Sequence, residues 1–384
     1  MAGTWPKGTV GWVGKGTGMD GSAGDLAVFA FVVALRLFVP LLIPKFPLPA
    51  VIACLIIDGV DQTIFQKYTD LDLTGYQSYD KALDIYYLTI AYMSTFRNWE
   101  NFYGFEMSRF LYYYRLAGVA LFEITHLRAV LLFFPNTFEY FFIFYETVRL
   151  RWNPVRMSAT VVVLAAGAIW VFIKVPQEYW IHIAQRDVTD TLRADPWLIP
   201  VIIAAVAGLL VFTWWAITYR LPPADKPSIS FSVADPFGHE EYQRANLTLR
   251  DRPLFNRSLF ERIILVALVC FIFSQILPNS NLSSVELTIG VAILIILNTI
   301  VSEFLARRGM DWQSAFTEFI AMMVVNAGIL GLYRLVAGSN DDVRWGNTIF
   351  MLFIISLLIT LYDRYQPYHY LREEARLAAK AATA

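Results

Sequence analysis

The segment that decides the fold runs from Trp197 to Tyr219 and reads WLIPVIIAAVAGLLVFTWWAITY. It contains no charged side chain. A helix of about 20 apolar residues is long enough to cross the hydrocarbon core of a bilayer. The segment therefore predicts a membrane-spanning helix, and apolar runs of similar length recur on both sides of it.

The composition of the whole chain agrees with this prediction. Of its 384 residues, 57% are hydrophobic and 16% are charged, whereas soluble domains have about 45–50% apolar and about 25% charged residues. The 31 basic and 32 acidic side chains give a formal charge of −1, which offers no basic surface for nucleic acid. Two cysteines cannot form a disulfide scaffold. These numbers exclude a soluble enzyme, a disordered chain and a nucleic-acid-binding protein.

Reading for membrane spans predicts an all-α, polytopic integral membrane protein with ten or eleven transmembrane helices. The candidate spans are residues 25–43, 47–62, 82–96, 105–134, 138–150, 156–175, 197–219, 261–277, 286–305, 314–337 and 346–362. Sixteen Lys and Arg residues fall on one side of these spans and five on the other, which predicts a cytoplasmic C-terminus. The compact loops and the absence of a signal peptide favour a bacterial plasma membrane.

The spans group into regions of different character. We expect a flexible Gly-rich tail (1–24), charged transmembrane helices (25–152), an apolar transmembrane pair (153–220), a cytoplasmic insert (221–260), C-terminal transmembrane helices (261–364) and a cytoplasmic tail (365–384). Residues 176–195 alternate polar and bulky apolar side chains, as an exoplasmic interfacial helix does. We expect this helix to cover a site beneath it with Glu178, Trp180 and His182.

The ionisable residues inside the early spans carry the functional prediction. A charge at the bilayer centre costs about 2.5–3.5 kcal/mol on insertion scales, so such residues face protein or water. We expect them to converge on an outward-facing polar cavity that serves as a substrate or ion relay. The candidate residues are Asp58, Asp61, Asp84, Arg109, Arg115, Glu123, His126, Glu139 and Glu146.

The helical spacing suggests roles for these residues. Arg115, Glu123 and His126 fall within one third of a helix circumference, and Glu123 with His126 is the predicted titrating pair. Asp58 and Asp61 would bind a cation or a substrate amine. Arg109 and Arg115 would keep the acids charged or bind an anion, and Glu139 and Glu146 share one face of the next helix.

Each of these features also has a purely structural interpretation. Two ion pairs that only fix the helix register would explain some of these charges equally well: Arg115 with Glu123, and Arg149 with Glu146. His126 could donate one hydrogen bond to a neighbouring carbonyl. The interfacial helix could be a passive anchor.

Three functions follow from the sequence. The first is a transporter or channel for a small solute or ion, and its transport could be coupled to protons. The second is a membrane-embedded transferase that acts on a lipid-phosphate-linked substrate at the outer face, with Asp70 and Asp72 holding a divalent cation; no other cofactor is predicted. The third is a non-catalytic subunit or assembly factor that binds a cytoplasmic protein through residues 221–258. Membrane lipids are expected partners in every case, and nucleic acid in none.

Overall fold

The protein is described by a computed structural model that covers residues 23–70, 76–180, 195–219, 222–250, 257–276, 290, 292–298, 300, 315–337 and 345–383. Within these ranges the chain is helical apart from turns and short connections, and they contain no β-strand. The predicted all-α class is confirmed for this part of the chain. The predicted N-terminal tail lies almost wholly outside the described residues, as does most of the predicted interfacial helix.

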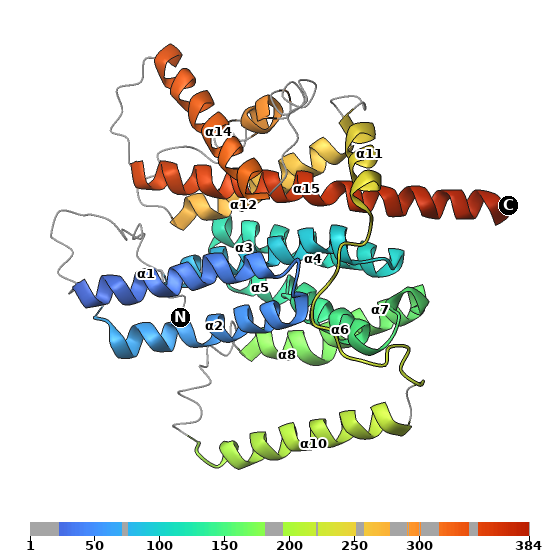
Figure 1. Ribbon diagram of the computed structural model, residues 1–384. Helices are drawn as coiled ribbons and strands as arrows, with labels where there is room; N and C mark the ends of the chain where they lie inside the picture. Colours follow the sequence, from blue (N-terminus) through green and yellow to red (C-terminus); the bar gives the residue numbers. More distant parts are fainter. Residues whose placement is uncertain are drawn as a thin grey trace. The chain divides into compact units, whose positions relative to one another are not determined.

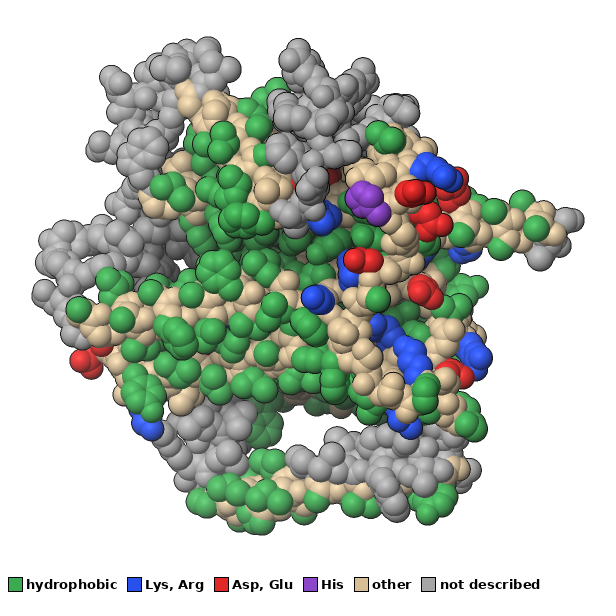
Figure 2. Space-filling model, viewed as in Figure 1, with side chains coloured by type: hydrophobic (Ala, Val, Ile, Leu, Met, Phe, Trp, Pro, Cys, Tyr) green, Lys and Arg blue, Asp and Glu red, His purple; other side chains and the backbone are tan. Residues whose placement is uncertain are grey.

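Several helices have the length and surface of membrane spans. Among the residues whose side chains are described, five helical segments are long and apolar enough to cross a membrane: Ala23–Leu42, Pro47–Tyr68, Ala159–Glu178, Arg257–Gln275 and Thr348–Ala382. Large apolar side chains such as Phe31, Ile56 and Phe172 are exposed on them. Figure 2 shows hydrophobic side chains covering helices α1 (Ala23–Phe38) and α2 (Pro47–Tyr68) on the face in view. An apolar exterior of this extent suits lipid rather than water.

The chain divides into two compact units, residues 1–100 with 232–384 (unit 1) and residues 101–231 (unit 2). Unit 1 contains α1, the 3₁₀ turn η1 (Val39–Leu42), α2, α3 (Tyr76–Asn98), α11 (His239–Arg250), α12 (Arg257–Ile276), α14 (Ala315–Ala337) and α15 (Trp345–Thr383) (Figure 1). Helix α3 packs against α1, α2, α12 and α15. It is the central helix of this unit, because every side chain from 82 to 99 is buried.

Polar residues are tolerated inside α3 because they bond to its own backbone. The hydroxyl of Thr89 donates to the Ile85 carbonyl at 2.5 Å, and those of Ser94 and Thr95 donate to Ala91 and Tyr92, both at 2.7 Å. A hydroxyl bonded in this way brings no unsatisfied group into the apolar interior. The hydroxyl-rich segment 82–96 therefore forms a core helix despite its modest hydrophobicity.

Helix α15 is 39 residues long and contains Pro367 in its interior. Its first half is buried in unit 1 through Ile354, Leu358 and Tyr362. Farther along, Arg372 donates from Nη1 to the Phe96 carbonyl at 2.7 Å and from Nη2 to the Arg97 carbonyl. These are carbonyls of the last turn of α3, which lack helical partners and sit at the negative end of the helix dipole.

We expect Arg372→Ala to destabilise the protein by about 1.5–3 kcal/mol, the range for hydrogen bonds that involve a charged group. The measurement is the thermal unfolding midpoint in detergent. Arg376→Ala, at an exposed position one turn farther along α15, is the matched control and should leave the midpoint almost unchanged. Equal effects of the two substitutions would contradict the capping role of Arg372.

The second part of the predicted cytoplasmic insert belongs to unit 1 and contacts other parts of it. Val233 N–H donates to the Lys45 carbonyl at 2.9 Å, and Asp235 lies 2.7 Å from Arg97. On α11, the Tyr242 hydroxyl donates to the Arg364 carbonyl at 3.0 Å. Burial raises the pKa of the Tyr242 phenol above its usual range, which keeps this donor protonated. These contacts occupy part of the surface that the sequence assigns to a cytoplasmic partner.

Unit 2 contains α4 (Phe102–Thr125), α5 (Ala129–Phe133), α6 (Thr137–Arg151), the 3₁₀ turn η2 (Pro154–Arg156), α7 (Ala159–Ala168), the π-helical turn η3 (Ile169–Lys174), α8 (Val175–Glu178) and α10 (Leu198–Tyr219). Helices α4 and α6 are antiparallel neighbours. Gly104, near the start of α4, lies against Tyr145 near the end of α6. The ring centroids of Tyr112 and Phe138, nearer the other ends, are 5.7 Å apart.

Two helix boundaries in unit 2 differ from the prediction. The expected span 105–134 is not one helix: α4 ends at Thr125, His126 takes the left-handed conformation with φ 54°, and α5 follows as a separate short helix. The expected boundary between the span 156–175 and the interfacial helix 176–195 is also absent, because α7, η3 and α8 follow one another without a gap through Glu178. Pro176 does not interrupt this helix: it directly follows the π turn, where the regular α-helical hydrogen-bond pattern is already changed.

Candidate functional site

A group of charged side chains lies where α1, α2 and α3 meet in unit 1. We call it the Arg36 cluster: Arg36 on α1, Asp58 and Asp61 on α2, and Asp80, Lys81 and Asp84 on α3. Residues three or four positions apart lie on the same face of a helix. Asp58 with Asp61, and Asp80 with Asp84, therefore each present two carboxylates to the same neighbour, and that neighbour is Arg36.

The guanidinium of Arg36 contacts all four carboxylates. Its Nη2 lies 2.5 Å from Asp58 Oδ1 and 3.0 Å from Asp84 Oδ1. Its Nη1 donates to Asp61 Oδ2 and lies 3.1 Å from Asp80 Oδ1. Lys81 adds a second cation, with Nζ 2.8 Å from Asp80 and 3.4 Å from Asp84.

The cluster is closed at one side and open at the other. The side chains of Arg36 and Asp61 are 3% and 0% exposed, whereas that of Asp58 is 29% exposed. The Tyr79 ring lies 6.0 Å from the Arg36 guanidinium and packs against Phe29 and Phe65. Asp58 is therefore the carboxylate of the cluster that water or a solute reaches most easily.

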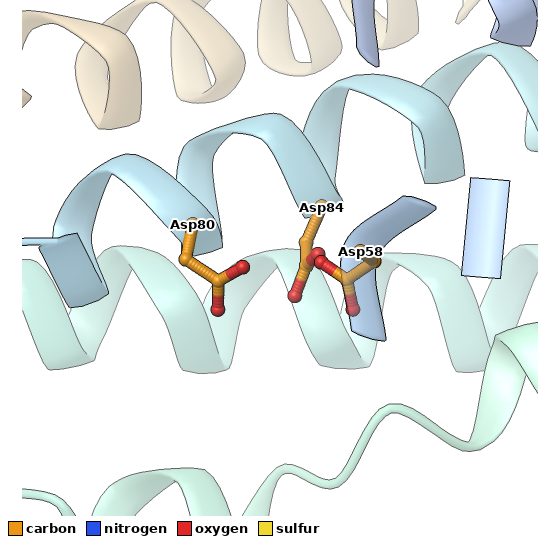
Figure 3. A group of neighbouring side chains, drawn as sticks. All are labelled: Asp58, Asp80 and Asp84. Atoms are coloured by element: carbon orange, nitrogen blue, oxygen red, sulfur yellow. The ribbon is translucent and has the colours of Figure 1, made fainter. Parts of the chain in front are cut away.

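The charge balance of the cluster is its main chemical feature. Four carboxylates face two cations, so the six residues carry a formal charge of −2. Figure 3 shows Asp58, Asp80 and Asp84 pointing toward one another, and one oxygen from each lies within 4.8 Å of the others. Negative charge without a compensating cation is costly in a low-dielectric interior. Three carboxylates this close together can therefore share a proton or hold a cation.

A pocket of about 700 Å³ lies along α1 and α2 next to the Arg36 cluster. Its wall is mostly apolar and includes Phe31, Leu35, Val60 and Ile64. Asp25 is the acidic residue among those that line it. The sequence predicts a polar cavity among the charged early spans, whereas the wall of this pocket is apolar. Arg36, Asp58 and Asp61 belong to the same two helices but are not among the residues that line the pocket.

The other predicted relay residues belong to unit 2 and make separate contacts. Arg109 lies 3.4 Å from Glu106 on the same helix. Arg115 is buried, and its Nη1 donates to the Phe134 carbonyl at 2.9 Å. Glu123 is buried, whereas His126 is exposed at the end of α4, where it forms the left-handed cap.

Helix α6 holds the two remaining predicted acids. Glu146 is fully buried and lies 2.6 Å from Arg149, one turn along the same helix. Glu139 accepts a hydrogen bond from Asn136 Nδ2 at 3.0 Å and lies 3.7 Å from Lys174. Of the nine predicted relay residues, the structure thus assigns Asp58, Asp61 and Asp84 to unit 1 and the other six to unit 2.

The predicted lid and metal residues are described only in part. Glu178 is buried and accepts a hydrogen bond from Asn136 N–H at 3.2 Å, and Trp180 is 39% exposed. Asp70 is exposed just after α2 ends. His182 and Asp72 lie outside the described residues.

Sequence reasoning missed Arg36, the residue at the centre of the site, and with it the roles of Asp80 and Lys81. A signal was present: after Asp25, Arg36 is the only charged residue of the apolar run 25–43. A single cation in such a run needs a partner, just as a single acid does.

A comparison with known proteins found no matching family model, no matching curated protein and no matching solved structure.

Proposed function

We propose that the chain is a multi-pass membrane transporter or channel for a small solute or ion, in which the Arg36 cluster binds and releases a proton or small cation. The proposal includes the topology inferred from the sequence, with ten or eleven spans in a bacterial plasma membrane and a cytoplasmic C-terminus. The observation that carries it is the surplus of two negative charges on six buried or half-buried residues that join three helices.

The arrangement suggests how occupancy is coupled to helix position. A proton or cation on Asp58 weakens the attraction of that carboxylate for Arg36, while Asp61, Asp80 and Asp84 still hold the guanidinium. Asp58 and Asp61 belong to α2, whereas Asp80 and Asp84 belong to α3. Loading Asp58 therefore shifts the position of Arg36 toward α3 and loosens the contact between α1 and α2.

We expect Asp58→Asn to reduce proton flux at least tenfold, because the amide keeps the shape of the side chain but cannot take up a proton. The measurement uses proteoliposomes that contain a pH-sensitive dye, with flux driven by a potassium diffusion potential. Asp70→Asn is the matched control, because Asp70 is exposed beyond the end of α2. Wild-type flux in Asp58→Asn protein that is monodisperse and normally stable would overturn the proposal.

One observation favours a second candidate function, the membrane-embedded transferase. Carboxylate oxygens of Asp58, Asp80 and Asp84 are close enough together to hold one divalent cation. The same Asp58→Asn variant decides between the two functions. Manganese-dependent turnover of a lipid phosphate that Asp58→Asn abolishes, together with no proton flux in the wild type, would favour the transferase.

A further inference from the structure

A second buried polar cluster lies in unit 2, where α6 begins and α8 ends. We call it the Glu139 cluster: Asn136, Thr137, Glu139, Lys174 and Glu178. Each of the five residues is at most 5% exposed. Buried polar groups inside membrane helices are costly, and they mark ion or substrate sites more often than accidents of packing.

Direct contacts join four of the five residues, and the fifth, Thr137, follows Asn136 in the chain. Asn136 Nδ2 donates to Glu139 Oε2 at 3.0 Å, and Asn136 N–H donates to Glu178 Oε1 at 3.2 Å. Lys174 Nζ lies 3.7 Å from the same Glu139 oxygen and 4.0 Å from the centroid of the Tyr140 ring. Asn136 therefore joins the two acids, and Lys174 closes the group on the side of Tyr140.

An irregular helix brings Lys174 and Glu178 to this place. The chain passes from α7 into the π-helical turn η3 and then into α8. A π turn inserts an extra residue into the helical repeat and rotates all the side chains that follow, and such turns are frequent at functional sites. Lys174 is the last residue of η3 and Glu178 is the last residue of α8. The directions of both side chains therefore depend on the change of register that the π turn introduces.

Two oxygen atoms in the cluster lack a hydrogen-bond partner. They are Oδ1 of Asn136 and Oγ1 of Thr137, and both are buried. Asn136 Oδ1 belongs to the same amide group as Nδ2, and Nδ2 donates to Glu139. A buried acceptor without a donor costs about 1–3 kcal/mol, and native proteins satisfy such groups with water or an ion.

The chemistry of these atoms selects the ligand. The amino end of α6 stabilises the carboxylates of Glu139 and Glu178, but it supplies nothing for Asn136 Oδ1, which requires a donor or a cation. Amide, hydroxyl and carboxylate oxygens together form a ligand set for a hard cation. Two acids and one lysine give these five residues a formal charge of −1.

We propose that the Glu139 cluster binds a monovalent metal ion through Asn136 Oδ1, Thr137 Oγ1 and a Glu139 carboxylate oxygen. In this proposal the ion is the partner that both buried oxygens lack. Lys174 disfavours a divalent ion, because its ammonium group lies beside the same carboxylate. This site is separate from the Arg36 cluster and does not depend on the function proposed for it.

Sodium is the probe, and the test uses the purified full-length protein in detergent. Binding is measured as uptake of radioactive sodium by the immobilised protein and as the shift of the unfolding midpoint with NaCl, at ionic strength held constant with N-methylglucamine chloride. We expect saturable binding and a midpoint that rises with sodium, because a ligand that binds only the folded state stabilises it. A wild-type protein that shows neither effect would overturn the proposal.

Thr137→Val gives the decisive comparison, because it removes one proposed ligand atom and keeps the branched shape. Without sodium its midpoint should equal or exceed that of the wild type, since the lost hydroxyl has no partner. Its sodium affinity should fall at least tenfold. Thr147→Val, on the same helix, is the control: Thr147 is exposed, and its hydroxyl bonds to the Ile143 carbonyl.

The remaining outcomes also decide the question. Wild-type sodium affinity in Thr137→Val would contradict the proposed ligand set. Asp58→Asn should keep the full sodium response, so failure of the Arg36 cluster as a transport site leaves this result unchanged. A sodium response lost in Asp58→Asn and kept in Thr137→Val would assign the ion to the Arg36 cluster and end the proposal.

Discussion

Arg36→Gln is expected to lower the free energy of unfolding by about 3–5 kcal/mol, the usual cost of removing one partner from a buried ion pair. The reason is that four carboxylates lose the one guanidinium that contacts all of them, and Asp61 is left fully buried. Thermal and chemical unfolding in detergent measure the change.

Two further variants separate the lost charge from a general packing defect. Arg36→Gln combined with Asp61→Asn should recover part of the lost stability, because it removes the most deeply buried of the carboxylates. Arg109→Gln is the control and should cost less than about 1 kcal/mol, since Arg109 faces Glu106, a half-exposed acid, at 3.4 Å. If Arg36→Gln is no more harmful than Arg109→Gln, the convergence of charges on Arg36 is unimportant for folding.

Gly118→Ala is expected to be the most damaging single-methyl change in unit 2. A Cβ atom at this position would lie 2.1 Å from Phe134 Cβ and 2.6 Å from Phe134 Cγ, far inside van der Waals contact. Phe134 cannot easily retreat, because its carbonyl accepts the hydrogen bond from buried Arg115. Overpacking of a buried site costs about 1–3 kcal/mol or more, and here it also strains that bond.

Gly167→Ala is the matched control for this prediction. Gly167 lies in α7 with no atom within 4 Å of an added Cβ, so alanine should be neutral or should stabilise the helix by up to about 1 kcal/mol. The unfolding midpoints of the two variants should therefore move in opposite directions, or Gly118→Ala alone should fall. Similar midpoints would show that α4 and α5 are not packed as described.

The helices could largely be predicted from the sequence, because long apolar helices leave a strong signal in it. Segments 47–62 and 82–96 correspond to α2 and α3, although their ends differ. Local conformations carried no such signal. Helix α4 ends at His126 in the left-handed conformation, a position usually taken by glycine or asparagine. The sequence of residues 159–178 contains no pattern that predicts a π turn.

The candidate site could be predicted only in part, because its contacts join residues distant in sequence. The helical spacing places Asp58 with Asp61 on one face of their helix. It cannot show that Arg36 lies against them, because Arg36 meets Asp58 and Asp84 across 22 and 48 positions of sequence. A lone arginine near the end of an apolar run also resembles one whose side chain extends to the membrane surface.

The proline inside α15 has a mechanical consequence. Pro367 has no N–H, so it removes one hydrogen bond from the α-helical pattern of α15, and a helix bends most easily at such a point. The farther half holds the end of α3 through Arg372, and the beginning of α3 bears Asp80 and Asp84. Since α3 is one continuous helix of 23 residues, we expect a bend at Pro367 to be transmitted through Arg372 to the end of α3 that carries Asp80 and Asp84, and so to the charges around Arg36.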